Sequence, residues 1–152
     1  MAHLASARVG SAMVVALGML TLGACSSDPP GPTAAQAEAT LKADIDWLMK
    51  LVQAEDVKVT NEGGKNIPCG EGKSKRTYGI TGVSTSGVDD PVGTLNLLAG
   101  GLIKRGYKVA SADPATPRDE LIKKESYVKV VTTSPKEKNF VLSGETECLR
   151  TS

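Results

Sequence analysis

Few residues of this chain are suited to nucleophilic or acid–base catalysis. Its 152 residues include one histidine, His3, and three cysteines, Cys25, Cys69 and Cys148. A Ser-His-Asp triad, a Cys-His dyad and a histidine-based zinc site all need a histidine beside their other groups. His3 lies in an N-terminal segment with the plan of an export signal. We therefore expect the folded domain to hold no such site, no metal and no cofactor.

Two glycine motifs suggest a nucleotide site but lack required positions. Gly72-Lys73-Ser74 matches the end of a phosphate-binding P-loop, yet that motif needs glycine five residues before Gly72, where Ile67 stands. The pair Gly70 and Gly72 would need a third glycine at Lys75 to complete the dinucleotide fingerprint. We interpret this segment as a mobile loop without a nucleotide.

Carboxylates remain as candidates for catalysis. Asp89-Asp90 precedes Pro91, a pattern typical of a helix start, with a carboxylate at the N-cap and proline at the first helical position. No third acidic ligand is close in sequence, which argues against a calcium site. Two distant carboxylates can still converge in space, as in glycosidases. A histidine-independent carboxylate enzyme acting on cell-wall glycan is therefore our alternative functional hypothesis.

The basic residues include two short clusters. Lys73, Lys75 and Arg76 form the denser one, and Lys123-Lys124 forms the second. One interpretation is a solvated loop and strand edge. The other is contact with lipid headgroups or an anionic wall polymer, to which each lysine near such a surface contributes about 1 kcal/mol.

The charge balance argues against a nucleic-acid partner. The chain has 18 Lys+Arg and 17 Asp+Glu, and Arg8 is the only charged side chain before Cys25 if His3 is neutral. The remainder therefore balances at 17 against 17. Nucleic-acid-binding domains instead show a clustered basic excess.

Residues 1–24 follow the plan of an export signal. Arg8 precedes an apolar segment at residues 9–22, and small residues follow it. Those fourteen residues are too few for a membrane-spanning helix, which needs about 20. Leu22-Gly23-Ala24-Cys25 closes the segment and resembles the lipobox of bacterial lipoproteins.

The lipobox resemblance implies cleavage between Ala24 and Cys25 and transfer of diacylglycerol to the Cys25 sulfur. The protein would then be anchored by lipid on the extracytoplasmic face of the cell membrane. In a host with two membranes, Ser26 would favour the outer one. The alternative is an ordinary signal peptide, cut after Ala24 without lipidation.

The two remaining cysteines make an even pair in an oxidising compartment. We therefore predict a disulfide between Cys69 and Cys148. Closing a loop of roughly 80 residues would stabilise the fold by about 4.5 kcal/mol in the chain-entropy model. Two separate buried thiols are the alternative.

Three segments are expected: a signal peptide at residues 1–24, a lipidated flexible tether at 25–33 and one α+β domain at 34–152. The tether contains three prolines and no apolar periodicity. Thr33 and Gln36 form a capping box for a helix at residues 34–54, and Trp47 is predicted at the edge of the core. A second helix is predicted from Pro91, ending at Gly106.

Five strands are predicted from β-branched and alternating patterns, at residues 57–60, 76–83, 107–110, 127–132 and 139–143. Residues 134–138 are predicted to be a hairpin connection, and residues 120–124 fit either a helical turn or a strand. Runs of neighbouring strands favour an antiparallel sheet of about five strands with both helices on one face, an α+β fold.

The mature part also resembles, in outline, small secreted lipoproteins common in actinobacteria. The resemblance rests on Pro68-Cys69 before a strand, on Gly106-Tyr107 after a helix and on Cys148 near the end. It implies no activity and no active-site residues. We therefore expect a non-catalytic interaction or scaffold domain, whose partner is another envelope protein or an anionic wall polymer.

Overall fold

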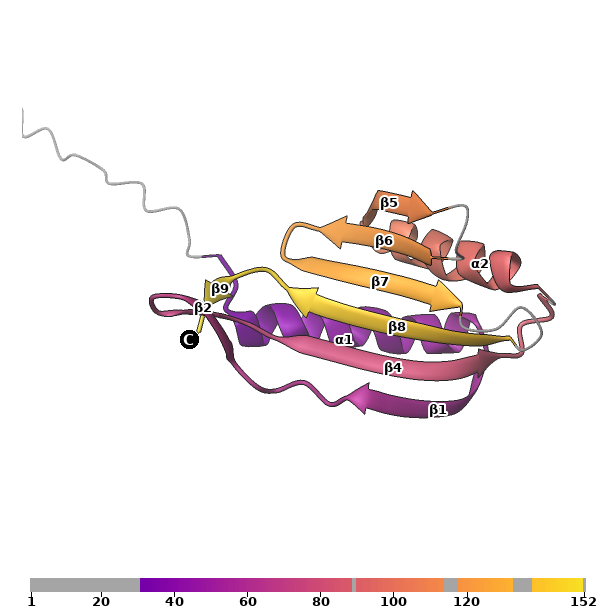
Figure 1. Ribbon diagram of the computed structural model, residues 1–152, viewed down its shortest axis with the longest axis horizontal. Coiled ribbons are helices and arrows are strands. Elements are labelled where there is room, and N and C mark those ends of the chain that lie inside the picture. Colours follow the sequence, from indigo (N-terminus) through magenta and orange to yellow (C-terminus); the bar gives the residue numbers. More distant parts are fainter. Residues whose placement is uncertain (1–30, 89, 114–117, 133–137, 152) are drawn as a thin grey trace, which may run out of the picture. The chain divides into compact units, whose positions relative to one another are not determined.

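The computed structural model describes residues 31–88, 90–113, 118–132 and 138–151, which all belong to one compact unit (Figure 1). The expected signal peptide, Cys25 and most of the tether lie outside the described residues, as do Asp89 and most of the 134–138 connection.

Within the described ranges the chain forms two helices and nine strands. In chain order they are α1 (Ala34–Leu51), β1 (Ala54–Asn61), β2 (Ile67–Gly70), β3 (Lys73–Lys75), β4 (Thr77–Ser84), α2 (Pro91–Lys104), β5 (Lys108–Asp113), β6 (Arg118–Lys123), β7 (Ser126–Thr132), β8 (Asn139–Thr146) and β9 (Leu149–Arg150).

The main sheet has six strands in the order β1-β4-β8-β7-β6-β5, and every neighbouring pair is antiparallel. The α+β prediction is confirmed, but the expected number of about five strands was too small. The additional strand is β6, in the segment that fitted either helix or strand. A second sheet, in the order β2-β3-β9, was not predicted, because its strands are two to four residues long and include glycine, proline and lysine.

Helix α1 begins at the predicted capping box. The Thr33 backbone N–H donates to Oε1 of Gln36 at 2.9 Å, and the Gln36 backbone N–H donates to the Thr33 hydroxyl at 3.3 Å. The helix ends at Leu51 rather than at residue 54. Gln53 adopts a left-handed conformation with φ 48°, which turns the chain directly into β1.

Helix α2 uses the predicted proline start and glycine stop. The Gly93 backbone N–H donates to Oδ1 of Asp90 at 2.7 Å, so Asp90 is the N-cap and Pro91 is the first helical residue. At the other end Gly106 has φ 90°, a conformation that glycine adopts with little strain, and β5 follows.

Both helices cover the same face of the main sheet (Figure 1). Helix α1 packs on β4 and β8, helix α2 packs on β6 and β7, and the two helices also contact each other. Trp47 is partly buried and packs against the core, as predicted at its edge. The buried apolar residues are Leu41, Ile45, Leu48, Val52, Ile80, Leu95, Leu98, Ala99, Leu102, Tyr107, Leu121, Val128, Val130, Phe140 and Leu142.

Candidate functional site

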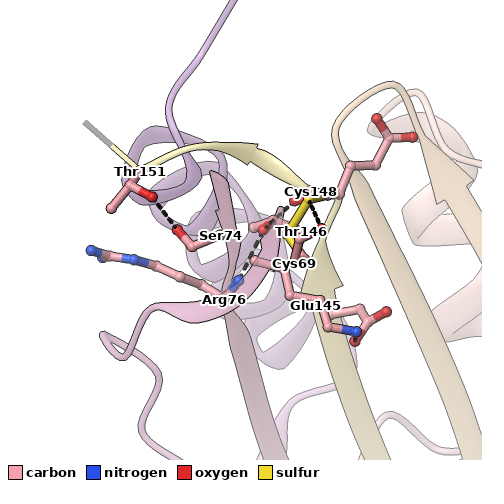
Figure 2. The surroundings of a disulfide bond; sticks show 9 residues. Cys69, Ser74, Arg76, Glu145, Thr146, Cys148 and Thr151 are labelled. Carbon is pink, nitrogen blue, oxygen red and sulfur yellow. Dashed lines mark hydrogen bonds and ion pairs between the residues drawn. A yellow bond between two sulfur atoms is a disulfide. The ribbon is translucent and has the colours of Figure 1, made fainter. Parts of the chain in front are cut away.

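A disulfide bond closes the small three-stranded sheet (Figure 2). Cys69 lies in β2, and Cys148 lies between β8 and β9. Their Cα atoms are 5.9 Å apart and their sulfur atoms are bonded, which confirms the predicted pairing. Since β3 pairs with both β2 and β9, the disulfide ties together the two outer strands of this sheet. We call this region the disulfide end of the domain.

The two ends of the described chain meet at the disulfide end. Arg150 in β9 forms an isolated parallel bridge with Thr33, and its Nη2 donates to the carbonyl oxygen of Gly31 at 2.9 Å. The next residue, Thr151, donates its backbone N–H to the Gly72 carbonyl at 3.1 Å. Its hydroxyl lies 3.2 Å from that of the buried Ser74 (Figure 2). The point at which the N-terminal segment enters the domain is therefore fixed.

Arg76 is one of the three predicted surface cations, but it forms an ion pair with a buried carboxylate. Its Nη1 lies 2.9 Å from Oε2 of Glu38, which is only 3% exposed. Lys42 lies 3.2 Å from the other carboxylate oxygen, which also accepts the Gly64 backbone N–H at 2.5 Å. The Arg76 backbone N–H donates to the Thr146 hydroxyl at 3.0 Å (Figure 2).

The electrostatics of Glu38 favour its charged form. Burial alone would raise its pKa, but the hydrogen bonds from Arg76, Gly64 and Lys42 together outweigh that effect and lower the pKa below 4.5. Glu38 and Arg76 thus join α1 to the start of β4. The side chain of Arg76 is 18% exposed, so little of it is available to an external anion.

The other two cations of this cluster, Lys73 and Lys75, differ in whether they form an ion pair. Lys75 forms an ion pair with Glu145 at 3.1 Å, with both side chains more than one-third exposed. Such an exposed pair is worth little and exchanges easily with water or an external anion. Lys73 is exposed, and it has no ion-pair partner among the residues that the structure describes. Of the three cations, Lys73 and Lys75 remain accessible.

The second predicted cluster is divided between the interior and the surface. Lys123 Nζ lies 3.1 Å from Oδ2 of Asp44, which is 1% exposed, and Arg105 Nε lies 2.7 Å from Oδ1. Lys124 follows β6 in the turn and is exposed. Burial raises the pKa of the neighbouring Tyr107, and the negative charge of Asp44 raises it further. Lys123 therefore stabilises the fold, while Lys124 faces solvent.

The sheet face opposite the helices contains a hollow of about 240 Å³. Lys129, Ser143 and Gly79 are paired across β7, β8 and β4, so two small residues adjoin there and leave space. Tyr127 borders the hollow, and its pKa is raised to about 12 by burial and by its hydrogen bond to Glu120. Tyr127 is therefore protonated at neutral pH and cannot act as a base there.

The described residues favour no catalytic arrangement. They contain no group of three histidine, cysteine or acidic side chains that could hold a metal ion. Asp90 caps α2, as the sequence indicated. Asp44 is paired with Arg105 and Lys123. Glu38 is paired with Lys42 and Arg76, and hydrogen bonds from these side chains and from the Gly64 backbone lower its pKa. A carboxylate with a lowered pKa is a poor general acid at neutral pH.

Sequence reasoning did not identify Glu38 and Asp44, although a signal was present. Both lie on the stripe of α1 that otherwise contains buried apolar residues, including Leu41, Ile45 and Leu48. A carboxylate at such a position must be paired when it is buried. Their partners Arg76, Arg105 and Lys123 are 38 to 79 residues away in sequence.

Among the described residues, neither helix has the length and apolar character needed to cross a membrane. Comparison with protein-family models, with curated proteins and with solved structures gave no match.

Proposed function

We propose that this protein is a lipid-anchored lipoprotein of the cell envelope, whose disulfide-closed domain is a non-catalytic interaction or scaffold module on the extracytoplasmic face of the membrane. The lipobox-like Leu22-Gly23-Ala24-Cys25 supports the anchor. The disulfide between Cys69 and Cys148 is consistent with an oxidising compartment, because such bonds are rare in the cytosol.

The hydrogen bond from Arg150 to Gly31 carries the geometric part of this proposal. It fixes Gly31 beside β9 at the disulfide end. Cys25 precedes Gly31 by six residues, and a fully extended chain covers about 3.3–3.6 Å per residue. An acylated Cys25 would therefore hold Gly31 within about 20 Å of the lipid, and the disulfide end would be the part of the domain nearest the membrane.

The accessible cations at this end support the same orientation. Lys73 and Lys75 would meet anionic headgroups or an anionic wall polymer, each contributing about 1 kcal/mol near such a surface. Arg76, paired with Glu38, is not part of this contact. The opposite end of the domain would then point away from the membrane, toward a protein partner.

Metabolic labelling tests the anchor. Host cells expressing the full chain are grown with an alkyne analogue of palmitate, and the protein is captured and probed for label. We expect label and membrane fractionation for the wild type, loss of both for Cys25→Ser, and retention of label for Cys69→Ser. An unlabelled wild-type protein in the soluble fraction would refute the lipid anchor.

Crosslinking in intact cells tests the interaction module. The wild-type chain with a C-terminal tag and its Cys25→Ser version are crosslinked and purified in parallel. We expect one envelope protein to be recovered with the wild type and to be lost with the mislocalised Cys25→Ser chain. Recovery of the tagged chain alone would argue against a protein partner.

A further inference from the structure

A second hollow, of about 470 Å³, lies where β5 begins and where the turn between β6 and β7 reverses the chain. We call it the lysine hollow, because lysines are the most numerous residues that line it. Its lining residues are Gly106, Lys108, Ile122, Lys123, Lys124, Ser126, Tyr127 and Glu147.

The three lysines come from three different local structures. Lys108 begins β5 and is paired with Ile122, Lys123 ends β6, and Lys124 lies in the turn. Lys108 and Lys124 are exposed, and neither has an ion-pair partner in the described part of the chain. One carboxylate, that of Glu147, also lines the hollow. The lining therefore keeps a net positive charge, even when the pairing of Lys123 with Asp44 is counted.

Lys123 differs from the two exposed lysines because its side chain is held in place. Its ammonium group is fixed between Oδ2 of Asp44, at 3.1 Å, and the ring of Tyr107, whose centroid is 5.2 Å away. One cation of the hollow is thus held in place before any ligand arrives, which reduces the entropy lost on binding. Gly106 adds no side chain to the opening, and Ser126 contributes a hydroxyl to the lining.

We propose that the lysine hollow binds a phosphate group. An ammonium group is a compact point charge with three donors, and lysine is a common phosphate ligand in proteins. A phosphate has several acceptor oxygens and up to two negative charges, so it can accept hydrogen bonds from Lys108 and Lys124, while Lys123 stays paired with Asp44 and adds its charge nearby. Neutral ligands would gain no charge attraction from these lysines.

The position of the hollow indicates where its phosphate comes from. Ser126 is paired with Thr146, and Tyr127 with Glu145, which is paired in turn with Thr77. The β6–β7 turn is therefore at the same end of the main sheet as the start of β4, next to the disulfide end. Under the proposed function, on which this source rests, that end lies near the membrane and the phosphate belongs to a lipid headgroup. The same chemistry would accept a soluble phosphate.

Vesicle sedimentation tests the site on the full chain carrying Cys25→Ser, so that no lipid anchor contributes. The probes are vesicles of phosphatidylcholine with and without phosphatidylglycerol, at low salt. We expect binding only to the anionic vesicles. Lys108→Gln with Lys124→Gln should weaken it about 25-fold, from about fivefold for each lysine near an anionic surface.

The matched control is Lys50→Gln with Lys58→Gln. It removes the same charge at two exposed lysines in α1 and in β1, the edge strand farthest from β5 in the sheet. We expect this pair to bind like the parent chain. The urea midpoint of each variant, read from Trp47 fluorescence, shows that the fold is kept. Equal binding by the two paired variants, or binding by the Lys108/Lys124 variant equal to that of the parent, would overturn the site.

Titration with inorganic phosphate distinguishes the two sources. Amide shifts confined to residues that line the hollow, and abolished by the Lys108/Lys124 substitutions, would support a site for soluble phosphate. No shifts, together with the expected vesicle result, would assign the site to lipid headgroups. The proposal would be overturned if the Lys108/Lys124 variant bound vesicles like the parent chain and phosphate caused no amide shifts. That result would refute the phosphate site even if Cys25 is lipidated, so the site and the lipid anchor are tested separately.

Discussion

Two adjacent glycines in α2 provide a sharp test of how the helices pack. A Cβ added at Gly101 would lie 2.5 Å from Cδ2 of Leu48, 2.7 Å from Cδ2 of Leu51 and 3.2 Å from Cζ3 of Trp47. All three side chains belong to α1. A Cβ added at Gly100 meets nothing within 4 Å. We predict that Gly101→Ala destabilises the domain and that Gly100→Ala stabilises it.

The magnitudes follow from two opposing effects. Replacing glycine by alanine within a helix gains about 1 kcal/mol at either position. At Gly101 the added methyl overfills the contact between the helices, which typically costs about 1–3 kcal/mol. Leu51 is partly exposed and can move aside, but Leu48 is fully buried and cannot. We expect Gly101→Ala to lower the free energy of unfolding by about 1 kcal/mol and Gly100→Ala to raise it by about as much.

Urea unfolding of the full chain carrying Cys25→Ser measures both values. Trp47 is the single tryptophan and lies at the contact between the helices, so its fluorescence reports the unfolding of this region. Each alanine variant serves as the control for the other, since the two positions share one helix. If the free energies of unfolding of the two variants were equal, the close packing of α1 on Gly101 would be refuted.

Three further predictions concern cross-links and charges. Replacing Cys69 and Cys148 together by serine should lower the free energy of unfolding by up to about 4.5 kcal/mol, measured with urea; no change would contradict a stabilising cross-link. Folding lowers the pKa of Glu38, so its stabilising contribution is complete above pH 4.5 and is lost as the pH falls through the folded pKa. Glu38→Gln should therefore destabilise the domain more at pH 7 than at pH 3 in urea titrations, and an equal loss at both would refute this. Burial raises the pKa of Asp119 above 3.8, so the stability of the domain falls as the pH rises from 3.8 to the folded pKa, and the loss is complete above it. Asp119→Asn should stabilise the domain at pH 7 but not at pH 3, and a stabilisation of equal size at both would show that the charge is not its cause.

The features predicted correctly from the sequence depend on residues that are close together in the chain. The capping box joins Thr33 to Gln36, and the start of α2 joins Asp90 to Gly93, each across three residues. Apolar periodicity likewise identified the buried side of α1. Local geometry decides these features, so the tertiary structure adds little to them.

Strand β6 shows where local reasoning fails. Of its six residues, Arg118–Lys123, only Leu121 is buried, and the others give no clear alternation. The segment is a strand because β5 and β7 pair with it on both sides. The β2-β3-β9 sheet depends on a more distant pairing, since β9 joins β3 from more than 70 residues away. Pairing between distant segments is not encoded in a short window of sequence.

The cysteine count and the compartment suggested by the N-terminal segment were enough to predict the Cys69–Cys148 disulfide, and local patterns were enough to predict the helices and the α+β class. Only the tertiary structure decided what each cation does. Arg76 and Lys123 are bound to carboxylates on α1 that are 38 and 79 residues away, while Lys124 remains at the surface. The physical reason is that the cost of a buried charge depends on its partner in space, and the fold brings that partner from a distant part of the chain.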